Sequence, residues 1–267
     1  MDSQSKDSTR RGRHIQVFGL EGLPMIKSGD DLGRLIISAA KQRGIPVEDG
    51  DIFVVAQKVI SKMEGRIVEI DEVMPSERAL KIASVTGRDP RIVELVLGES
   101  KRFLKVSPQT IIVEDKRNIV NINAGIDKSN VQGENRYILL PVDPDKSARE
   151  LSLRIKELTG RKVGVIICDT YSRPFRRGQV NFAIGLEGIE PFVDYRGEKD
   201  LFGYTMQVKF TAVADELAST AELVMGQGKE AIPVAIIKGF NTLVVDEPSS
   251  SDSLIISEEE DLFKNAL

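Results

Sequence analysis

The sequence of 267 residues contains no tryptophan, one cysteine and one histidine. The single cysteine, Cys168, excludes a disulfide within the chain and a zinc site built from cysteines, and it fits a reducing, cytoplasmic compartment. The single histidine, His14, argues against a Ser-His-Asp or Cys-His catalytic set and against a His-rich transition-metal site. Carboxylates, hydroxyls, Lys, Arg and backbone amides remain, and such hard oxygen ligands favour Mg²⁺ or Mn²⁺.

The sequence also lacks an excess of positive charge and any long apolar run. It has 37 Lys and Arg against 41 Asp and Glu, so no overall basic field attracts nucleic acid. No apolar stretch approaches the length of a membrane span, and the N-terminus has no apolar signal core, so we expect no membrane partner. Residues 1–13 are polar and predict a disordered tail, whereas residues 14–267 predict one catalytic unit, with two intertwined subdomains as the alternative.

The most informative stretch surrounds Asp169 and Thr170. The apolar run 163–168 predicts a strand that is buried on both faces and ends at Asp169. A carboxylate and a hydroxyl at this point can ligate a divalent cation or contact a phosphate. The following loop carries three arginines, which pair well with phosphate or carboxylate groups. Taken alone, an Asp-Thr pair at a strand end more often caps a turn.

A second polar stretch, residues 121–130, follows predicted strands at 110–113 and 118–122. Its Asn and Asp residues are typical of a plain turn. So many polar side chains also make Asp127 a candidate metal ligand and Asn130 a candidate nucleotide contact. Asp127 and Asp169, from two strand ends, would form a minimal clamp for a divalent cation.

Two lysines and a glycine loop offer contacts for an anion. Lys58 and Lys62 lie in and beside a predicted buried strand, 51–60, where a lysine extends to solvent or needs a partner such as a phosphate or a substrate carboxylate. The loop 225–232 combines glycines with Lys229, but its spacing is not that of a Walker motif.

The remaining periodicity predicts an ordinary set of connecting elements. Residues 66–70 are expected to pair back as a hairpin, and the charged stretch 99–105 is expected to be a solvated connection. Gly185 and Gly188 indicate close backbone approach. Further predicted helices lie at 32–40, 76–85, 90–97, 146–159 and 214–225, and further strands at 14–20, 205–213 and 233–237.

Six widely spaced motifs then occur in one order along the chain. They are Gly22-Leu-Pro-Met-Ile-Lys, Ser61-Lys62 followed by Glu64-Gly65, Asn123-Ala-Gly-Ile-Asp-Lys-Ser-Asn130, Leu139-Leu-Pro, Asp169-Thr170 with Arg173-Pro174, and Asp194-Tyr-Arg-Gly. From about Val17 to Leu267 the sequence resembles the coenzyme F-420 gamma-glutamyl ligase family. The resemblance implies an α+β fold of largely antiparallel mixed sheets with flanking helices, specific to this family and distinct from Rossmann and ATP-grasp folds.

The resemblance also implies an activity and its partners. The family's enzymes use GTP to add L-glutamate to the carboxylate of a deazaflavin precursor, forming gamma-glutamyl amide bonds in coenzyme F-420 biosynthesis. Two divalent metal sites for Mg²⁺ or Mn²⁺, a possible K⁺ requirement and a homodimer are implied as well. The charged and aromatic segment 194–203 is a candidate for the dimer contact.

By the same resemblance, Asp127 and Asp169 match ligands of one divalent metal, and Thr170 matches a ligand of a second. Gln227 stands where we would expect an acidic ligand of the second metal; an amide oxygen can ligate Mg²⁺ but brings no charge. Lys62 joins Asp127 and Asp169 as a candidate catalytic residue. The matched nucleotide contacts are Leu23, Pro24, Met25, Ile26, Gln57, Lys58, Lys62, Asn130, Met225, Gly226, Gln227, Gly228, Lys229, Glu230, Ala231 and Ile232.

The residue chemistry agrees with this activity. A carboxylate and an amine do not condense at neutral pH without activation, so the terminal phosphate of GTP would pass to the substrate carboxylate and the glutamate amine would displace it. Metal, Lys and Arg cations stabilise the transferring phosphoryl group, which needs no histidine or cysteine. Two alternatives are a metal-dependent phosphotransferase that acts on another small acid without glutamate, and a paralogue that binds GTP without turnover.

Overall fold

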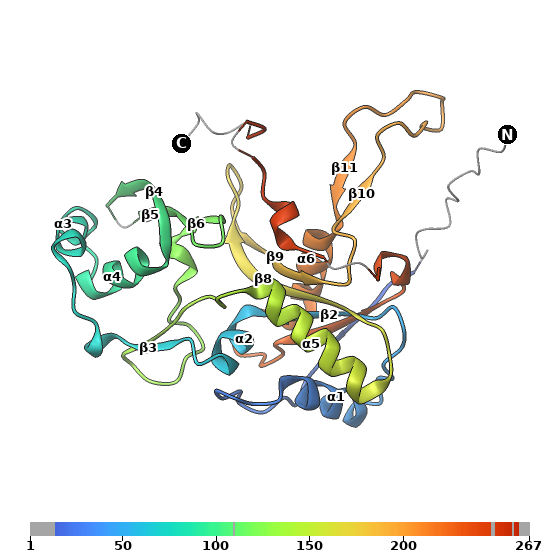
Figure 1. Ribbon diagram of the computed structural model, residues 1–267, viewed down its shortest axis with the longest axis horizontal. Coiled ribbons are helices and arrows are strands. Elements are labelled where there is room, and N and C mark those ends of the chain that lie inside the picture. Colours follow the sequence, from blue (N-terminus) through green and yellow to red (C-terminus); the bar gives the residue numbers. More distant parts are fainter. Residues whose placement is uncertain (1–13, 109, 247–248, 258, 262–267) are drawn as a thin grey trace. The chain divides into compact units, whose positions relative to one another are not determined.

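The computed structural model describes residues 14–108, 110–246, 249–257 and 259–261. The tail predicted at 1–13 lies outside the described residues. The chain divides into two compact units. The first contains residues up to 26, then 30–59 and 144–251, and the second contains 27–29, 60–143 and the residues from 252 onwards. The described parts form six α-helices and several mostly antiparallel sheets, which confirms a mixed α+β structure (Figure 1).

The first unit is built on a five-stranded sheet with the order β1-β12-β2-β8-β9. Neighbouring strands are antiparallel except for β2 and β8, which run parallel with Ile52 opposite Gly164. Each of the three central strands contains a run of buried apolar residues, as expected for strand segments covered on both faces. The strands are β1 (Gln16–Gly19), β12 (Val234–Lys238), β2 (Ile52–Ala56), β8 (Gly164–Ser172) and β9 (Gln179–Glu187).

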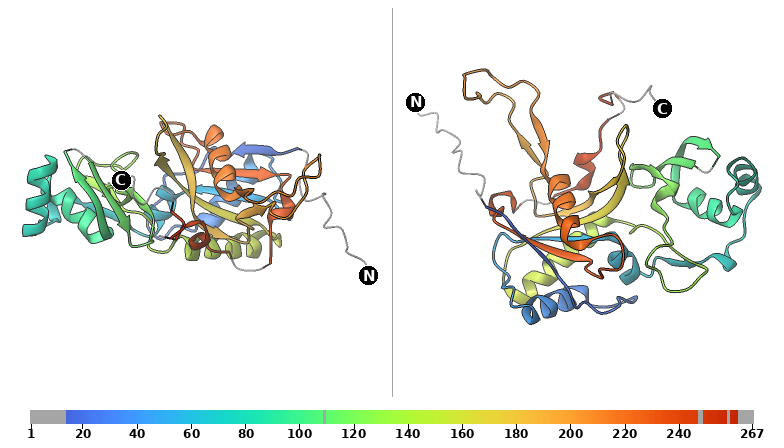
Figure 2. Two further views of the ribbon diagram at one scale, coloured as in Figure 1. Left: turned by 90° about the horizontal axis from the view of Figure 1, so that it is seen from above. Right: turned by 180° about the vertical axis from the view of Figure 1, so that it is seen from behind.

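Three helices cover this sheet. In Figure 2, α5 (Pro144–Thr159) and α6 (Val213–Met225) lie on opposite faces of it. Helix α1 (Leu32–Gln42) begins at the N-cap Asp31, whose side chain accepts a hydrogen bond from the Arg34 backbone N–H at 3.0 Å. The Asp31 carboxylate also pairs with Arg154 of α5 at 2.7 Å, which ties the two helices together.

Gly185 of β9 lies where the backbone of α5 comes very close to the sheet. A Cβ at this position would lie 2.6 Å from the carbonyl oxygen of Pro144, at the start of α5. Such a contact is too short for any side chain, so only glycine lets α5 approach the sheet here. The close approach predicted for Gly185 is therefore confirmed.

A hairpin extends from the first unit (Figure 1). Its strands, β10 (Phe192–Asp194) and β11 (Phe210–Ala212), pair antiparallel, and the Phe192 and Phe210 rings stack with their centroids 4.4 Å apart. The loop between them exposes Leu201 and Phe202 to 97% and 95%. The strand predicted at 205–213 is thus confined to its last part, because the residues before Phe210 belong to this loop.

The second unit has a small helical and sheet core. Helices α3 (Glu77–Thr86) and α4 (Pro90–Glu99) bury Ala79, Val93 and Val96 against Ile111 and Val113. The Ile111 and Val113 side chains belong to the central strand of the β4-β5-β6 sheet. The strands of this unit are β4 (Ser100–Ser107), β5 (Thr110–Asp115), β6 (Val120–Ile122), β3 (Ile67–Glu69) and β7 (Arg136–Ile138), and the last two pair antiparallel.

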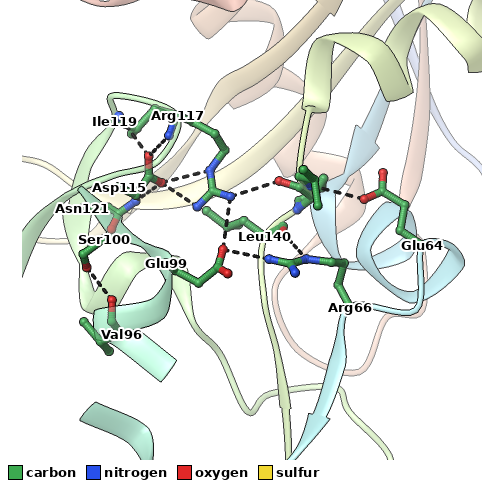
Figure 3. A network of polar contacts seen from close by, with 12 residues as sticks. Glu64, Arg66, Val96, Glu99, Ser100, Asp115, Arg117, Ile119, Asn121 and Leu140 are labelled. Carbon is green, nitrogen blue, oxygen red and sulfur yellow. Dashed lines mark hydrogen bonds and ion pairs between the residues drawn. The ribbon is translucent and has the colours of Figure 1, made fainter. Parts of the chain in front are cut away.

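A closed ion network lies inside the second unit (Figure 3). The fully buried Asp115 carboxylate lies 2.9 Å from the Arg117 guanidinium and accepts hydrogen bonds from Asn121 and from the backbone of Ile119. Glu99 pairs with Arg117 at 3.6 Å and with Arg66 at 2.8 Å. Two carboxylates therefore face two guanidiniums. This balance of charge is what permits their burial.

Four local predictions are wrong, each for a tertiary reason. Strand β2 ends at Ala56, and the chain continues as helix α2 (Gln57–Met63), so Gln57, Lys58 and Lys62 are helical. Strand β8 continues beyond Asp169 to Ser172 because β9 pairs with it that far. Strand β3 pairs with the distant β7, not with its predecessor in sequence. The charged stretch from Ser100 forms β4, an edge strand, where exposed charges are common.

Within the described ranges, no helix combines the length and apolar content that crossing a membrane requires.

Candidate functional site

Three uncharged side chains bring their oxygen atoms together in the first unit. Thr170 on β8 lies opposite Asn181 on β9, and Gln227 follows the end of α6. The Thr170 Oγ1 atom is 2.9 Å from Asn181 Oδ1 and 2.9 Å from Gln227 Oε1. We call Thr170, Asn181 and Gln227 the oxygen cluster. It brings together the two residues that the sequence assigns to a second metal.

Helix α6 holds the cluster against the edge of the sheet. Strand β9 is an edge strand, whose outward backbone groups would otherwise lack partners. Asp215, Ser219 and Glu222 stand at positions i, i+4 and i+7 of α6 and therefore share one side of the helix. Asp215 accepts from the Ala183 N–H at 2.9 Å, Ser219 donates to the Asn181 C=O at 2.8 Å, and Glu222 accepts from the Asn181 N–H at 2.9 Å.

The second oxygen of Glu222 reaches the oxygen cluster. Glu222 Oε1 accepts a hydrogen bond from Gln227 Nε2 at 2.8 Å, and Gln227 Nε2 is also 3.2 Å from Asn181 Oδ1. In the part of the chain that the structure describes, no Lys or Arg forms an ion pair with Glu222. Burial, with the nearby charges of Asp169 and Glu222, raises the pKa of the Cys168 thiol well above its usual range. Cys168 is therefore a neutral packing residue.

The oxygen cluster fits a hard cation by its chemistry. The Thr170 hydroxyl has one proton, yet two carbonyl oxygens approach it, so it can donate to only one of them at a time. Amide and hydroxyl oxygens are ligands for Mg²⁺ and Mn²⁺. Within the described ranges, no group of three or more His, Cys, Asp or Glu side chains is placed to hold a metal. The three residues of the oxygen cluster themselves contribute only neutral oxygens.

The glycine loop after α6 is exposed and partly closed on itself. Gly226 has a positive φ of 68°, and a Cβ there would lie 2.5 Å from the carboxyl carbon of Glu230. The Gly228 N–H donates to Glu230 Oε2 at 2.7 Å. Ala231 also has a left-handed backbone, with φ 55°. Since a left-handed alanine is strained, this loop holds a shape that the surrounding structure imposes.

The second unit contains the other candidate polar site. Asp127 accepts hydrogen bonds from the backbone and the hydroxyl of Ser129 at 2.8 and 2.7 Å, so its turn-capping role is real. Lys62 Nζ donates to the Asn130 C=O at 2.8 Å and brings two predicted nucleotide contacts together. Before them, Asn123 and Ala124 both have positive φ, at 54° and 55°. Such strain is concentrated where the backbone is shaped for a ligand.

The remaining candidates occupy varied environments. Gln57 is buried, Lys58 is half-buried, and Met25 is 67% exposed beside the buried Ile26. Asp169 is half-buried on β8 in the first unit, whereas Asp127 belongs to the second unit. The predicted Asp127–Asp169 clamp thus takes one carboxylate from each unit, and it stays a prediction.

Sequence reasoning missed Asn181 and Glu222. Asn181 did give a signal, because it is a polar amide inside a run of small and apolar residues. The structure then buries it, with only 3% exposed. Glu222 gave none, because a glutamate near the end of a helix is ordinary. Only the fold shows that it faces β9 and Gln227.

Comparison with known proteins places the chain in a family. The pattern of the family described as "F420-0:Gamma-glutamyl ligase" matches residues 22–239. The coenzyme F420:L-glutamate ligase of Archaeoglobus fulgidus is 47% identical over 253 residues, which are 95% of this chain and 98% of that protein. The Methanocaldococcus jannaschii protein of the same name is 44% identical over 253 residues, again 95% and 98% of the two chains. The Methanothermobacter thermautotrophicus protein of that name is 46% identical over 226 residues, 85% of this chain and 89% of its own. The family pattern covers most of the chain, including the residues of the oxygen cluster, and the chain therefore belongs to the F420-0:gamma-glutamyl ligase family.

Proposed function

We propose that the protein is a GTP-dependent ligase that adds L-glutamate to the carboxylate of a deazaflavin coenzyme precursor. The observation that carries this proposal is the similarity, along 95% of the chain, to proteins named as coenzyme F420:L-glutamate ligases. The matches cover 95% of this chain and 98% of each of those two proteins, which supports extending their named activity to this chain.

The proposed reaction has two steps. A carboxylate oxygen of the precursor attacks the terminal phosphorus of GTP, GDP leaves, and an acyl phosphate forms. The amine of glutamate then attacks the acyl carbon, inorganic phosphate leaves, and the amine loses a proton as the amide forms. Phosphoryl transfer asks a protein mainly to position its reactants and to stabilise charge, which suits a chain with a single histidine and a buried cysteine.

The residues divide between holding metal and holding phosphate. Asp127 and Asp169 would hold one divalent cation, and Thr170 and Gln227 a second, while K⁺ would act as an additional monovalent cation. When bound, Mg²⁺ or Mn²⁺ neutralises negative charge on the transferring phosphoryl group. Lys62, whose ammonium is anchored at the Asn130 carbonyl, would place a positive charge beside the nucleotide phosphates.

The homodimer belongs to the same proposal. The hairpin of β10 and β11 exposes two large apolar side chains, Leu201 and Phe202, almost completely. Exposed apolar side chains of this size favour contact with another protein surface. Light scattering at micromolar protein should give twice the chain mass of 29.5 kDa, and a mass of one chain would remove this part of the proposal.

The activity is tested by supplying all reactants together. Purified protein is incubated with GTP, Mg²⁺ or Mn²⁺, L-glutamate and the unglutamylated coenzyme, and the products are read by mass spectrometry. The proposal predicts a product heavier by one or more glutamyl residues, formed only when GTP and glutamate are both present. GDP formation with a phosphorylated acid as the product, and no glutamate incorporation, would instead identify a phosphotransferase. GTP binding without turnover would identify a non-catalytic paralogue.

A further inference from the structure

The oxygen cluster depends on which way the Gln227 amide points. The oxygen and nitrogen of an amide have nearly the same shape, so their hydrogen-bond partners decide the orientation. Gln227 Nε2 lies 2.8 Å from Glu222 Oε1, and an ionised carboxylate only accepts hydrogen bonds. Turning the amide over would put two acceptors in contact. Glu222 therefore directs the Gln227 oxygen toward Thr170.

The same carboxylate orients a second amide through the first. Gln227 Nε2 is also 3.2 Å from the Asn181 side chain, which must present its oxygen to this donor. Asn181 Nδ2 then faces Cys168 Sγ at 3.5 Å, a weak acceptor in the buried strand. With Asn181 only 3% exposed, water cannot freely replace these partners. The Glu222 carboxylate thus fixes the orientation of the Gln227 amide directly and, through Gln227, the orientation of the Asn181 amide.

We propose that Glu222 is a positioning residue that aims the oxygens of Gln227 and Asn181 at Thr170 and supplies the negative charge that Gln227 lacks as a cation ligand. The proposal rests on the proposed function, because it concerns the second metal site. It answers a question that the sequence raises, namely how a neutral glutamine can replace an acidic ligand. The charge stands one hydrogen bond away from the ligand, and residues behind metal ligands commonly tune affinity in this way.

A purely structural role for Glu222 is the alternative. Its Oε2 accepts from the Asn181 N–H and covers the edge of β9, as Asp215 does two residues further along the strand. The chain therefore offers a matched control. Asp215 lies on the same side of α6 and performs the same edge-covering role at Ala183, and none of its hydrogen bonds reaches the oxygen cluster.

Glu222→Gln separates the two roles because it preserves shape. The oxygen of the introduced amide can still accept from the Asn181 N–H, but its NH₂ group then faces Gln227. Gln227 would have to turn over and present NH₂ to the cluster, where a donor repels a cation. We expect affinity for Mn²⁺ to fall by about 10- to 100-fold, the usual effect of removing a partner behind a metal ligand.

The test measures Mn²⁺ binding directly, by electron paramagnetic resonance of the free ion, with GTP absent and then present. Glu222→Gln should weaken binding by that factor, whereas Asp215→Asn should leave it unchanged. The double variant Glu222→Gln with Gln227→Glu should recover wild-type affinity, because it moves the carboxylate onto the ligand itself. Thermal unfolding of all variants without metal shows whether each one folds.

Three outcomes overturn the inference: wild-type protein that binds no Mn²⁺, a Glu222→Gln variant with unchanged affinity, or equal losses in Glu222→Gln and Asp215→Asn without recovery in the double variant. Its failure is distinguishable from failure of the proposed function. Mn²⁺ binding that depends on Glu222, in a protein that makes no glutamylated product, would sustain the inference and remove the ligase activity. A protein that makes the glutamylated product but whose Mn²⁺ affinity does not depend on Glu222 would sustain the ligase activity and remove the inference.

Discussion

The two units each contain a partly buried polar cluster, and their charges differ. In the second unit, Asp115 and Glu99 face Arg117 and Arg66, so the network is electrically balanced. In the first unit, Glu222 accepts a hydrogen bond from the oxygen cluster, and among the described residues it forms no ion pair with a Lys or Arg. The ion pairing of the carboxylates, not burial or polarity, therefore distinguishes the structural network from the candidate site.

The largest expected effect comes from removing the charge of Asp169, a predicted ligand of the first metal. Asp169→Asn keeps the shape of a predicted metal ligand on β8 but removes its charge, so turnover should fall roughly 1,000-fold, comparable to the loss of one group that stabilises the transition state. Steady-state kinetics at several Mn²⁺ concentrations measure it. Asp246→Asn, at an exposed ion pair with Lys162, is the control and should keep full activity. Near-normal turnover with unchanged metal dependence would show that Asp169 merely supports the strand.

Removing a guanidinium from the ion network of the second unit should lower stability, not activity. Arg117→Ala leaves the fully buried Asp115 without its guanidinium, so the free energy of unfolding should fall by about 3 kcal/mol. Urea unfolding measures this change. Arg161→Ala, which breaks an exposed pair with Asp49, should cost less than about 1 kcal/mol. Were the Arg117 variant as stable as the wild type but inactive, the contrast between a structural and a functional cluster would collapse.

A lysine outside both clusters should have an intermediate effect. Lys62→Ala removes the cation proposed to neutralise the nucleotide phosphates, so the first chemical step should slow by roughly 10- to 100-fold. Single-turnover measurement of GDP formation isolates this step. Lys62→Arg keeps the charge and should retain more activity. A variant that loses only its affinity for glutamate would assign Lys62 to the amino-acid pocket.

The ion pair between α1 and α5 should have the smallest effect. The hydrogen bond from Arg154, followed by that from the Arg34 backbone, lowers the pKa of Asp31 to about 2. Because the folded-state pKa is below the unfolded value of about 3.9, this stabilisation is complete above that value and is lost as the pH falls toward 2. Asp31→Asn keeps the helix cap, and should lower stability at pH 7 by less than about 1 kcal/mol and flatten its decline between pH 4 and 2. Urea unfolding across this range checks it, and an unchanged pH profile would contradict the assignment.

Local patterns in the sequence predict most elements but not where neighbouring elements meet. Helices such as α1 and α6 follow from their apolar spacing and termini, and the apolar cores of β2 and β8 follow from their runs. The end of β8 does not, because pairing with β9 carries the strand through Asp169 and Thr170. The same pairing sets Thr170 opposite Asn181. Register between strands decides which oxygens converge, and no local pattern encodes it.

The candidate site was predictable to the same extent. Thr170 and Gln227 were assigned together from the family resemblance, and the structure sets their oxygens 2.9 Å apart. Glu222 was not predictable, because its role depends on the side of α6 that faces β9. Sequence motifs thus point to candidate ligands such as Thr170 and Gln227, whereas the residues that pack behind them become visible only in the structure.

In the proposed reaction, the chain activates a carboxylate by phosphorylation before an amine attacks it. The most direct measurement labels the carboxylate oxygens of the coenzyme precursor with heavy oxygen and follows the label by mass spectrometry during turnover with GTP and glutamate. If an acyl phosphate forms, the oxygen that bridges carbon and phosphorus leaves with the phosphate, so one labelled oxygen should appear in each inorganic phosphate released. Unlabelled phosphate, formed together with authentic glutamylated product, would contradict this account.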